Sequence, residues 1–377
     1  MEENKTIDLE QTEETKEVKV YASRETLIDD VIKLCSIPSL SGFEYRAAEK
    51  VREIYEGKFD EIYTDLVGNQ VLVRRCGKEG APKILVDAHM DEVGMMVTDV
   101  LEGGFLRMTR VGGIDPAIIQ ASDVIICGNE TLRGVAVSTP PHLRAGRDAK
   151  LPPVEEVLVD VGLGYTLEEL QEMIPLGSPI VYAPVYSELG EKYIAGKSFD
   201  DKACGAIAAR AIIDTPREEL AGDVYLSLSA REETSRLGGV SASTFKINPD
   251  YAFVIDVNLG NGPDIPSSES VKLGGGISIS WSAATHRGLT KATIDLCKEK
   301  ELPVMAVASP SHTGTNSPSV NLVKEGIPTV DVGLPLRNMH TYNEVINLDD
   351  CNVLCGAVRE FICDADIAKR FGKEDIL

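Results

Sequence analysis

Short, almost wholly apolar runs that alternate with stretches of helical spacing constrain this chain more than any other feature of its sequence. The clearest run is KILVDAH at 83–89, which is typical of a strand buried on both faces of a sheet and which ends in a histidine. Further strands are expected at 223–229, 251–256, 303–307 and 328–332, and helices at 202–214, 284–300, 317–325 and 350–364. This alternation predicts an α/β fold in which helices sandwich a mixed, mainly parallel sheet.

The pattern changes between about 104 and 189. Short strand-like runs in this segment are separated by turn signals such as GG, GNE, PP and PLGS, and long helical periodicity is scarce. We therefore expect a compact β-rich insert that divides the α/β domain into residues 21–103 and 190–377. Residues 1–20 are polar and are expected to form a mobile or loosely docked N-terminal extension.

The charge balance and the N-terminus limit the partners and the compartment. The net charge of −22 disfavours binding to nucleic acid or to anionic membranes. No apolar run approaches the ~18 residues of a membrane span, and the first residues lack the apolar core of a signal peptide. The eight cysteines include no CxxC pair, which suits reduced thiols. We therefore expect a cytoplasmic protein with neither a nucleic-acid nor a membrane partner.

Two imidazoles and three carboxylates form a candidate ligand set for two divalent metal ions. They come from separate motifs and comprise His89, Asp200, Glu233, Asp256 and His340. The three acids lie at a turn or at the ends of expected strands, where ligands gather in open α/β sheets. The neighbouring Glu232 is a spare carboxylate that could act as a general base. Together these residues point to metal-assisted hydrolysis.

Each motif taken alone has a plainer explanation. An HxD pair such as His89 and Asp91 is weak evidence, although a side-chain period of two would let the aspartate hold the imidazole from behind. The adjacent acids Asp200 and Asp201 could cap a helix at a solvated turn. The acidic pair after the strand at 223–229 could begin a solvated helix. The prediction depends on the whole set of motifs.

The other histidines point less clearly to the site. His142 in TPPHL has the setting of a structural residue, and His286 in ATHRG could be either exposed or near the site. His312 in SPSHTGTN lies in a Gly/Ser loop, and such a loop residue could line a substrate pocket. Motifs of other enzyme classes, GxSxG, GxxxxGK[ST], HExxH and GxGxxG, are absent.

In their order along the chain, the motifs resemble those of the glutamyl aminopeptidase family of co-catalytic dinuclear metallopeptidases, also labelled cellulase-like, whose tetrahedral (TET) members are the best-known forms. The resemblance runs from about Thr26 to the end of the chain. Its motifs are LSGFE (40–44), VDAHMDEVG (86–94), VGGIDP (111–116), PPHL (140–143), GKSFDDKACG (196–205), the pair Glu232-Glu233, EGIPTVDVGLPLR (325–337) and MHTYNEVINLDD (339–350).

The resemblance implies a zinc-peptidase-like catalytic domain and a role for each candidate residue. His89 and Asp256 would each hold one side of a metal pair, and Glu233 and His340 would complete the shells. Asp200 would bridge the two ions, with a cis peptide bond to Asp201. Asp91 would orient His89, and Glu232 would be the general base. The resemblance further implies two zinc or cobalt ions per subunit, with manganese as a third option, and short peptides as substrates. The insert would be a small β-barrel dimerisation domain, so a homodimer is expected at least, and six dimers could close into a shell of twelve.

Two departures from the family's pattern bear on the substrate. The chain reads EETSRLGGV where EEVGLRGA is usual, and TGTNS where GGTDA is usual, which places Asn316 where an aspartate is common. That loop is expected near the amino end of the substrate, so Asn316 is a candidate substrate-binding residue. The alternatives are a deacylase or carboxypeptidase on the same metal centre, or a metal-stabilised oligomer without activity. A glycosidase would instead use paired carboxylates without metal.

Overall fold

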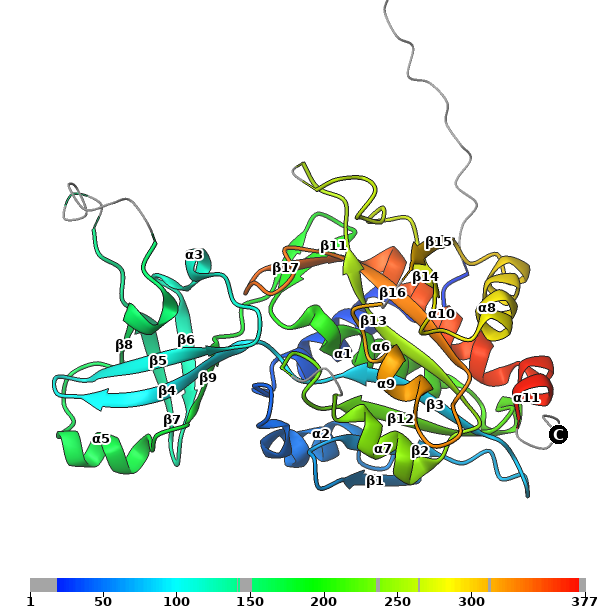
Figure 1. Ribbon diagram of the computed structural model, residues 1–377, viewed down its shortest axis with the longest axis horizontal. Coiled ribbons are helices and arrows are strands. Elements are labelled where there is room, and N and C mark those ends of the chain that lie inside the picture. Colours follow the sequence, from blue (N-terminus) through cyan, green and yellow to red (C-terminus); the bar gives the residue numbers. More distant parts are fainter. Residues whose placement is uncertain are drawn as a thin grey trace, which may run out of the picture.

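The computed structural model describes residues 19–140, 142, 151–234, 238–263, 265–310 and 313–372. It consists of a large α/β domain built on an 11-stranded sheet and a closed β-barrel that stands to one side of it (Figure 1). The fold class predicted from the sequence is confirmed. Most of the polar N-terminal extension lies outside the described residues. None of the helices in the described part of the chain is long and apolar enough to cross a membrane.

The α/β domain contains elements from both ends of the chain. Its helices are α1 (Arg24–Cys35), η1 (Glu44–Ala47), α2 (Ala48–Tyr55), α6 (Phe199–Asp214), η3 (Arg217–Glu219), α7 (Val240–Ile247), α8 (Arg287–Glu299), α9 (Ser317–Asn321), α10 (Leu348–Cys363) and α11 (Ala365–Phe371). Its strands are β1 (Glu61–Thr64), β2 (Gln70–Arg74), β3 (Lys83–His89), β10 (Ser187–Leu189), β11 (Tyr193–Gly196), β12 (Asp223–Ser229), β13 (Tyr251–Leu259), β14 (Ile277–Ser282), β15 (Val304–Ser309), β16 (Thr329–Arg337) and β17 (Glu344–Asn347).

The sheet is parallel at its centre and antiparallel toward its edges. The strand order is β1-β2-β12-β3-β13-β16-β17-β11-β10, with β14 pairing with β16 and β15. Strands β12, β3, β13 and β16 run parallel to one another. The register sets Ser229 beside His89. The carboxyl ends of these strands therefore meet at one edge of the sheet, where the predicted ligands follow them.

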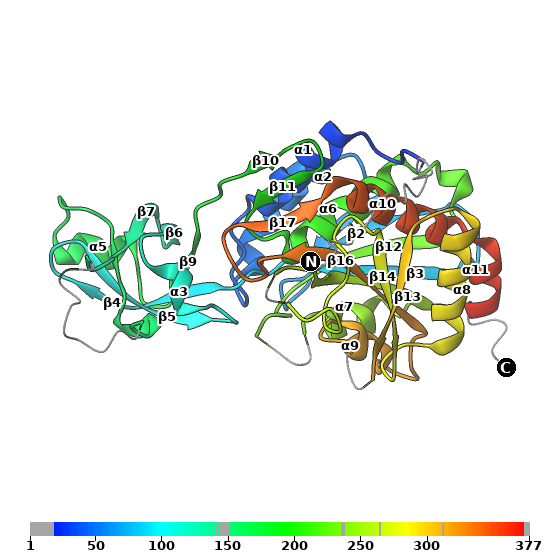
Figure 2. The ribbon, with the colours of Figure 1, turned by 90° about the horizontal axis from the view of Figure 1, so that it is seen from above.

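Helices cover the sheet on both faces, which explains why the central strands are largely apolar. Ile84 and Val86 of β3 pack into a core that includes α1, α6 and α10, whereas Leu85 packs against the layer of α7 and α9. Figure 2 shows these two groups of helices on opposite sides of the sheet. Each fully buried side chain of this kind contributes about 1.5–3 kcal/mol to folding.

Helix α6 is the innermost helix and carries the acidic pair Asp200-Asp201 at its start. It packs against the sheet, α1 and α10 at once, so nearly all of its residues are buried and small ones predominate. At Gly205 an added Cβ would come within 2.7 Å of the Leu228 side chain on β12. This close packing fixes the start of α6 at the edge of the sheet where β3 and β12 end.

The insert is a six-stranded antiparallel barrel. Its elements are β4 (Gly94–Leu101), β5 (Phe105–Val111), α3 (Pro116–Ile119), β6 (Asp123–Cys127), β7 (Thr131–Ala136), η2 (Val154–Glu156), β8 (Leu158–Asp160), α5 (Leu167–Met173) and β9 (Pro179–Tyr182). The strand order β4-β5-β8-β7-β6-β9 closes through β4 and β9. The barrel has an apolar core of its own, separate from the cores on the two faces of the sheet. It begins at Gly94, ahead of the expected boundary at 104, because the Gly103-Gly104 signal is the turn of the β4–β5 hairpin.

Candidate metal centre

The predicted ligands come together at the carboxyl edge of the central strands. His89 ends β3, Asp256 lies in β13, Asp200 lies at the start of α6, Glu233 follows β12, and His340 lies in the turn between β16 and β17. All of them except His340 are largely buried. Segments far apart in the sequence thus supply one compact group of nitrogen and oxygen donors.

Asp200 lies between the two imidazoles. Its Oδ1 is 3.0 Å from His89 Nε2 and its Oδ2 is 3.4 Å from His340 Nε2. Asp256 Oδ1 lies 3.9 Å from His89 Nε2, and Glu233 Oε1 lies 3.3 Å from His340 Nε2. The group therefore has two halves, each with one imidazole and one carboxylate of its own, and Asp200 faces both through separate oxygens.

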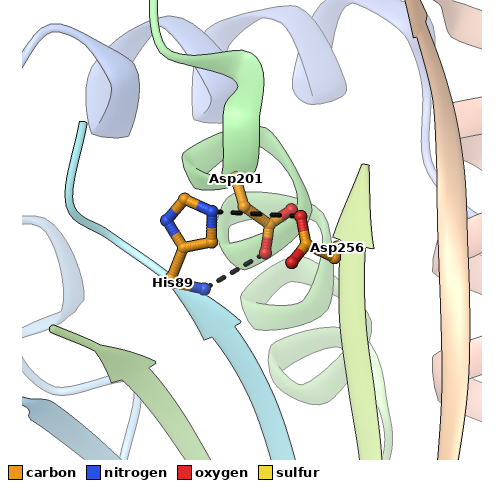
Figure 3. Close-up of side chains that lie close together, drawn as sticks. All are labelled: His89, Asp201 and Asp256. Atoms are coloured by element: carbon orange, nitrogen blue, oxygen red, sulfur yellow. Dashed lines mark hydrogen bonds and ion pairs between the residues drawn. The ribbon is translucent and has the colours of Figure 1, made fainter. Parts of the chain in front are cut away.

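Asp201 lies close to the same group, which the sequence did not distinguish from a helix cap. Its Oδ2 accepts the backbone N–H of His89 at 3.1 Å. Possible ligand atoms of His89, Asp201 and Asp256 all lie within 4.8 Å of one another (Figure 3). The same holds for possible ligand atoms of His89, Asp200 and Glu233. The peptide bond between Asp200 and Asp201 is cis, as the resemblance implied. Asp200 faces both imidazoles, whereas Asp201 supports the backbone behind His89.

The electrostatics of the group fit bound cations. Hydrogen bonds to Asp200 and Glu233 raise the pKa of His340 to about 11. Burial opposes protonation of His89, yet its hydrogen bonds to Asp200 and Asp91 raise its pKa above the ordinary value. Burial and the nearby charge of Asp201 raise the pKa of Asp256. The surroundings thus favour positive charge at this point, and divalent cations bound by imidazole and carboxylate would supply it in place of protons.

Both imidazoles are oriented from behind by backbone carbonyl groups. His89 Nδ1 lies 3.0 Å from the Asp91 carbonyl oxygen and 3.6 Å from Asp91 Oδ1. His340 Nδ1 lies 3.2 Å from the carbonyl oxygen of Gly113, where an added Cβ would approach the ring to 2.9 Å. Such contacts leave each Nε2 directed at the carboxylates, as in metal-binding histidines.

The acidic pair after β12 is held by Asp91. The backbone N–H of Glu232 donates to Asp91 Oδ1 and that of Glu233 donates to Asp91 Oδ2, both at 3.1 Å. Within the described part of the chain, the carboxylate of Glu232 has no hydrogen bond or ion pair of its own, whereas that of Glu233 contacts His340. Burial raises the pKa of Glu232 to about 7, with further contributions from Glu233 and Asp91. The two neighbouring glutamates therefore have different environments.

Three buried glutamates, which the sequence analysis left unassigned, support the turns that carry the site. Each accepts a hydrogen bond from a residue with positive φ. Glu44 accepts the backbone N–H of Arg231 at 2.9 Å, and Glu92 accepts the hydroxyl group of Ser198 at 2.8 Å. Glu344 accepts the backbone N–H of His340 at 2.9 Å. Non-glycine residues with positive φ cost free energy and persist where the surrounding structure holds them. The sequence signal was weak: Glu92 and Glu344 lie inside motifs that contain His89 and His340, whereas Glu44 ends the motif LSGFE, which contains no candidate ligand.

Glu92 also pairs with two buried lysines. Lys202 Nζ lies 2.9 Å from Glu92 Oε1, and Lys197 Nζ contacts Glu92 Oε2. Burial acts to raise the pKa of Glu92, but the two ammonium groups more than offset it and lower the pKa to about 2. Because Lys197 and Lys202 flank Asp200 in the sequence, this charged group fixes the turn that carries Asp200 from both sides.

Of the two candidate substrate-binding residues, the structure describes only Asn316. His312 lies outside the described residues. Asn316 is buried, and its Nδ2 donates to Asp87 Oδ2 at 3.0 Å and to Ser229 Oγ at 2.9 Å. It thereby joins the start of α9 to β3 and β12. His286, which the sequence left open, caps α8, where its Nδ1 accepts the backbone N–H of Leu289.

A pocket adjoins the ligand group on the side of the barrel. Besides Asp200, Glu233 and His340, its lining includes Val93, Tyr182 and Thr341. Val93 and Tyr182 belong to the core of the barrel where the chain enters and leaves it. A molecule in this pocket would therefore contact both the candidate metal ligands and the barrel.

Comparison with known proteins agrees with the resemblance. The sequence model of the M42 glutamyl aminopeptidase family matches residues 68–355. The lysyl aminopeptidase of Pyrococcus furiosus is 30% identical over 84% of this chain and 91% of its own length. The structure of an aminopeptidase from the archaeon Desulfurococcus kamchatkensis superposes with a TM-score of 0.83 at 28% identity, over 94% of this chain and 99% of that one. The Pyrococcus horikoshii TET1 peptidase, described as assembling into a tetrahedron or a large octahedral shell, gives a TM-score of 0.77 at 27% identity, over 89% and 99%.

Proposed function

Because the chain belongs to the M42 glutamyl aminopeptidase family and is therefore a peptidase hydrolase, we propose that it removes N-terminal residues from short peptides at a centre of two metal ions. The observation that carries this proposal is the position of Asp200, whose two oxygens face His89 and His340 separately. A carboxylate placed in this way can bridge two ions. The separate carboxylates of Asp256 and Glu233 then complete the two halves of the site.

The donor set indicates which ions suit the site. Because Asp256 lies 3.9 Å from His89, these two residues would hold one ion with Asp200 and not one side each as the resemblance implied. His340, Glu233 and Asp200 would hold the other ion. Imidazole nitrogens and carboxylate oxygens suit zinc and cobalt, with manganese as a third option. When bound, such ions supply Lewis-acid chemistry that lowers the pKa of water and polarises a carbonyl group.

Glu232 is proposed as the general base. Its backbone is fixed by Asp91, beside the proposed ligand Glu233, while its carboxylate stays free of partners among the described residues. It would take a proton from the attacking water and pass that proton to the amine that leaves when the peptide bond breaks. Asp91 would serve this step by holding the turn that carries both glutamates.

The pocket supports the choice of the amino end of a peptide. Its lining includes the proposed metal ligands Asp200, Glu233 and His340, so the end of a peptide that enters the pocket would reach the metal centre. Lys197 also lines the pocket, but it pairs with Glu92 and so does not offer a free cation to a C-terminal carboxylate. This favours an aminopeptidase over a carboxypeptidase.

Hydrolysis of a substrate panel tests this function. The zinc- or cobalt-loaded protein is expected to release anilide from aminoacyl anilides with a free α-amine and not from their N-acetylated counterparts. The panel reports the preferred first residue at the same time. Release of acetate from the acetylated substrates, with the anilide bond intact, would indicate a deacylase instead, and metal-loaded protein that is silent on every substrate would support a non-catalytic role.

We also propose that the barrel joins two subunits. It stands away from the sheet and exposes the apolar side chains of Val135 on β7 and of Val137 just after β7, at 45% and 39%. Burial of such a face against a second copy would leave the metal centre intact, and closed symmetric oligomers are common among soluble proteins. We further propose that six such dimers close into a shell of twelve, which is in keeping with the tetrahedral or octahedral shells described for the Pyrococcus horikoshii relative.

Light scattering of the purified protein should therefore give a mass of at least two chains at micromolar concentration. Val135→Glu should weaken the association because it places a charge on the outer face of β7. Leu66→Glu is the matched control, since Leu66 is fully exposed in the β1–β2 turn of the other domain. A mass of one chain for the unmodified protein would reject the dimer and the shell.

A further inference from the structure

Glu344 connects the turns that carry two of the proposed ligands. It begins β17 and is buried, with 2% of its surface exposed. Its Oε1 accepts the backbone N–H of His340 at 2.9 Å. Its Oε2 accepts the backbone N–H groups of Phe199 at 2.7 Å and of Asp200 at 3.1 Å. One carboxylate therefore reaches the backbone of both residues whose side chains meet at 3.4 Å in the site.

We propose that Glu344 is a positioning residue that holds His340 and Asp200 as one unit and so forms the metal position to which His340 belongs. This inference rests on the dinuclear function proposed above. Glu344 would not touch the ions itself. Its role is to keep the two ligands at a fixed separation before an ion arrives.

The backbone of His340 explains why it needs such support. Its φ is +62°, in the left-handed region that a non-glycine residue occupies at a cost in free energy. The hydrogen bond from its N–H to Glu344 and the contact of its ring with the carbonyl oxygen of Gly113 oppose relaxation of the turn. Loss of the first contact would free the backbone and leave the ring contact alone.

The two ligands that belong only to the other half, His89 and Asp256, are held independently of Glu344. His89 ends a strand in the centre of the sheet, and its backbone N–H donates to Asp201. Asp256 lies within β13, which pairs with β3 and β16. A change at Glu344 should therefore weaken one metal position selectively.

An amide cannot replace the Glu344 carboxylate. Both carboxylate oxygens accept N–H groups, whereas a glutamine side chain offers one acceptor and an NH₂ group. If the amide oxygen takes the two N–H groups of Phe199 and Asp200, the NH₂ group faces the N–H of His340. Two donors then face each other, and the turn that carries His340 loses its acceptor.

Titration of zinc into metal-free Glu344→Gln protein, by calorimetry with elemental analysis, tests the inference. The unmodified protein should bind two ions. The variant should bind one with unchanged affinity and the second about 10–100-fold more weakly, the usual effect of removing a group that orients a ligand. Glu344→Asp retains both acceptor oxygens and loses one methylene group. It should therefore fold even if Glu344→Gln does not, and its affinity for the second ion should fall by a smaller factor.

Asp350→Asn is the matched control. Asp350 is also buried and accepts the backbone N–H groups of Gly274 and Gly276, both at 2.7 Å, away from the ligands. This variant should keep both ions even if its melting temperature falls, whereas Asp200→Asn should weaken both positions.

The possible outcomes distinguish failure of the positioning role of Glu344 from failure of the proposed dinuclear function. Two ions at wild-type affinity in both Glu344 variants would overturn the positioning role and leave the dinuclear centre standing. Loss of both ions from Glu344→Gln, with Asp350→Asn intact, would overturn the selective assignment to the His340 position. Unmodified protein that binds no ion would contradict the proposed function itself.

Discussion

Metal-free protein is expected to be folded and inactive. The ligand residues are held by contacts within the protein, such as the pairing of β3 in the sheet and the hydrogen bonds from the acidic turn to Asp91. Removal of the ions should therefore leave the circular dichroism spectrum largely unchanged, while peptide hydrolysis falls to background. Zinc, cobalt or manganese added back should restore it, up to two ions per chain.

Metal binding should also release protons at neutral pH. The pKa of His340 is raised to about 11 by Asp200 and Glu233, so its imidazole carries a proton at pH 7 when no ion is bound. Only the neutral imidazole can act as a ligand, so the proton must leave as the ion enters. Calorimetry in buffers with different ionisation enthalpies measures this release. Full activity of protein shown by elemental analysis to be metal-free would contradict the mechanism.

The centre of the sheet could be predicted from the sequence because burial on both faces dictates it. The runs at 83–89 and 223–229 coincide with β3 and β12, whose side chains alternate between two helix layers. Both strands are buried on both faces and are therefore largely apolar, although they also carry a few buried polar residues. The same reasoning predicted that ligands would follow these strands.

Elements whose pairing depends on distant partners were harder to predict. The run ISISWS alternates serine with apolar residues and was not assigned, yet it forms β14 because β15 and β16 lie on either side of it. The strand expected at 328–332 continues to Arg337 as β16, through Pro335, which lacks an N–H group and usually ends a strand. The helix expected at 317–325 ends at Asn321 as α9.

The same distinction applies to the site: residues marked by local sequence features could be predicted, whereas those defined by distant contacts could not. The candidate ligands were recognisable because their residue types and positions after strands are local features of the sequence. Glu344 was not, because its contact with Phe199 spans 145 residues and only the fold brings the two together. Asn316 also shows this limit, since its hydrogen bonds to Asp87 and Ser229 join residues that lie far apart in the sequence.

Glu232→Gln should lower kcat by about 10²–10⁴-fold, the usual contribution of general acid–base catalysis. Glutamine preserves the size of the side chain but cannot accept the proton of the attacking water. The backbone N–H of residue 232 would still donate to Asp91, so the turn should keep its shape. Metal content should stay at two ions per chain, because the proposed ligands do not include Glu232. Stopped assays with the best aminoacyl anilide, together with elemental analysis, measure both quantities.

Glu233→Gln is the matched control, because it makes the same chemical change at the next residue of the same turn. Glu233 contacts His340 at 3.3 Å, so this variant should lose affinity for the ion at the His340 position as well as activity. The difference between the two variants therefore lies in metal content, since activity should fall in both. If Glu232→Gln loses metal and Glu233→Gln does not, the two glutamates have the opposite roles, and the free carboxylate of Glu232 would have to be a ligand that moves toward the ion when it binds.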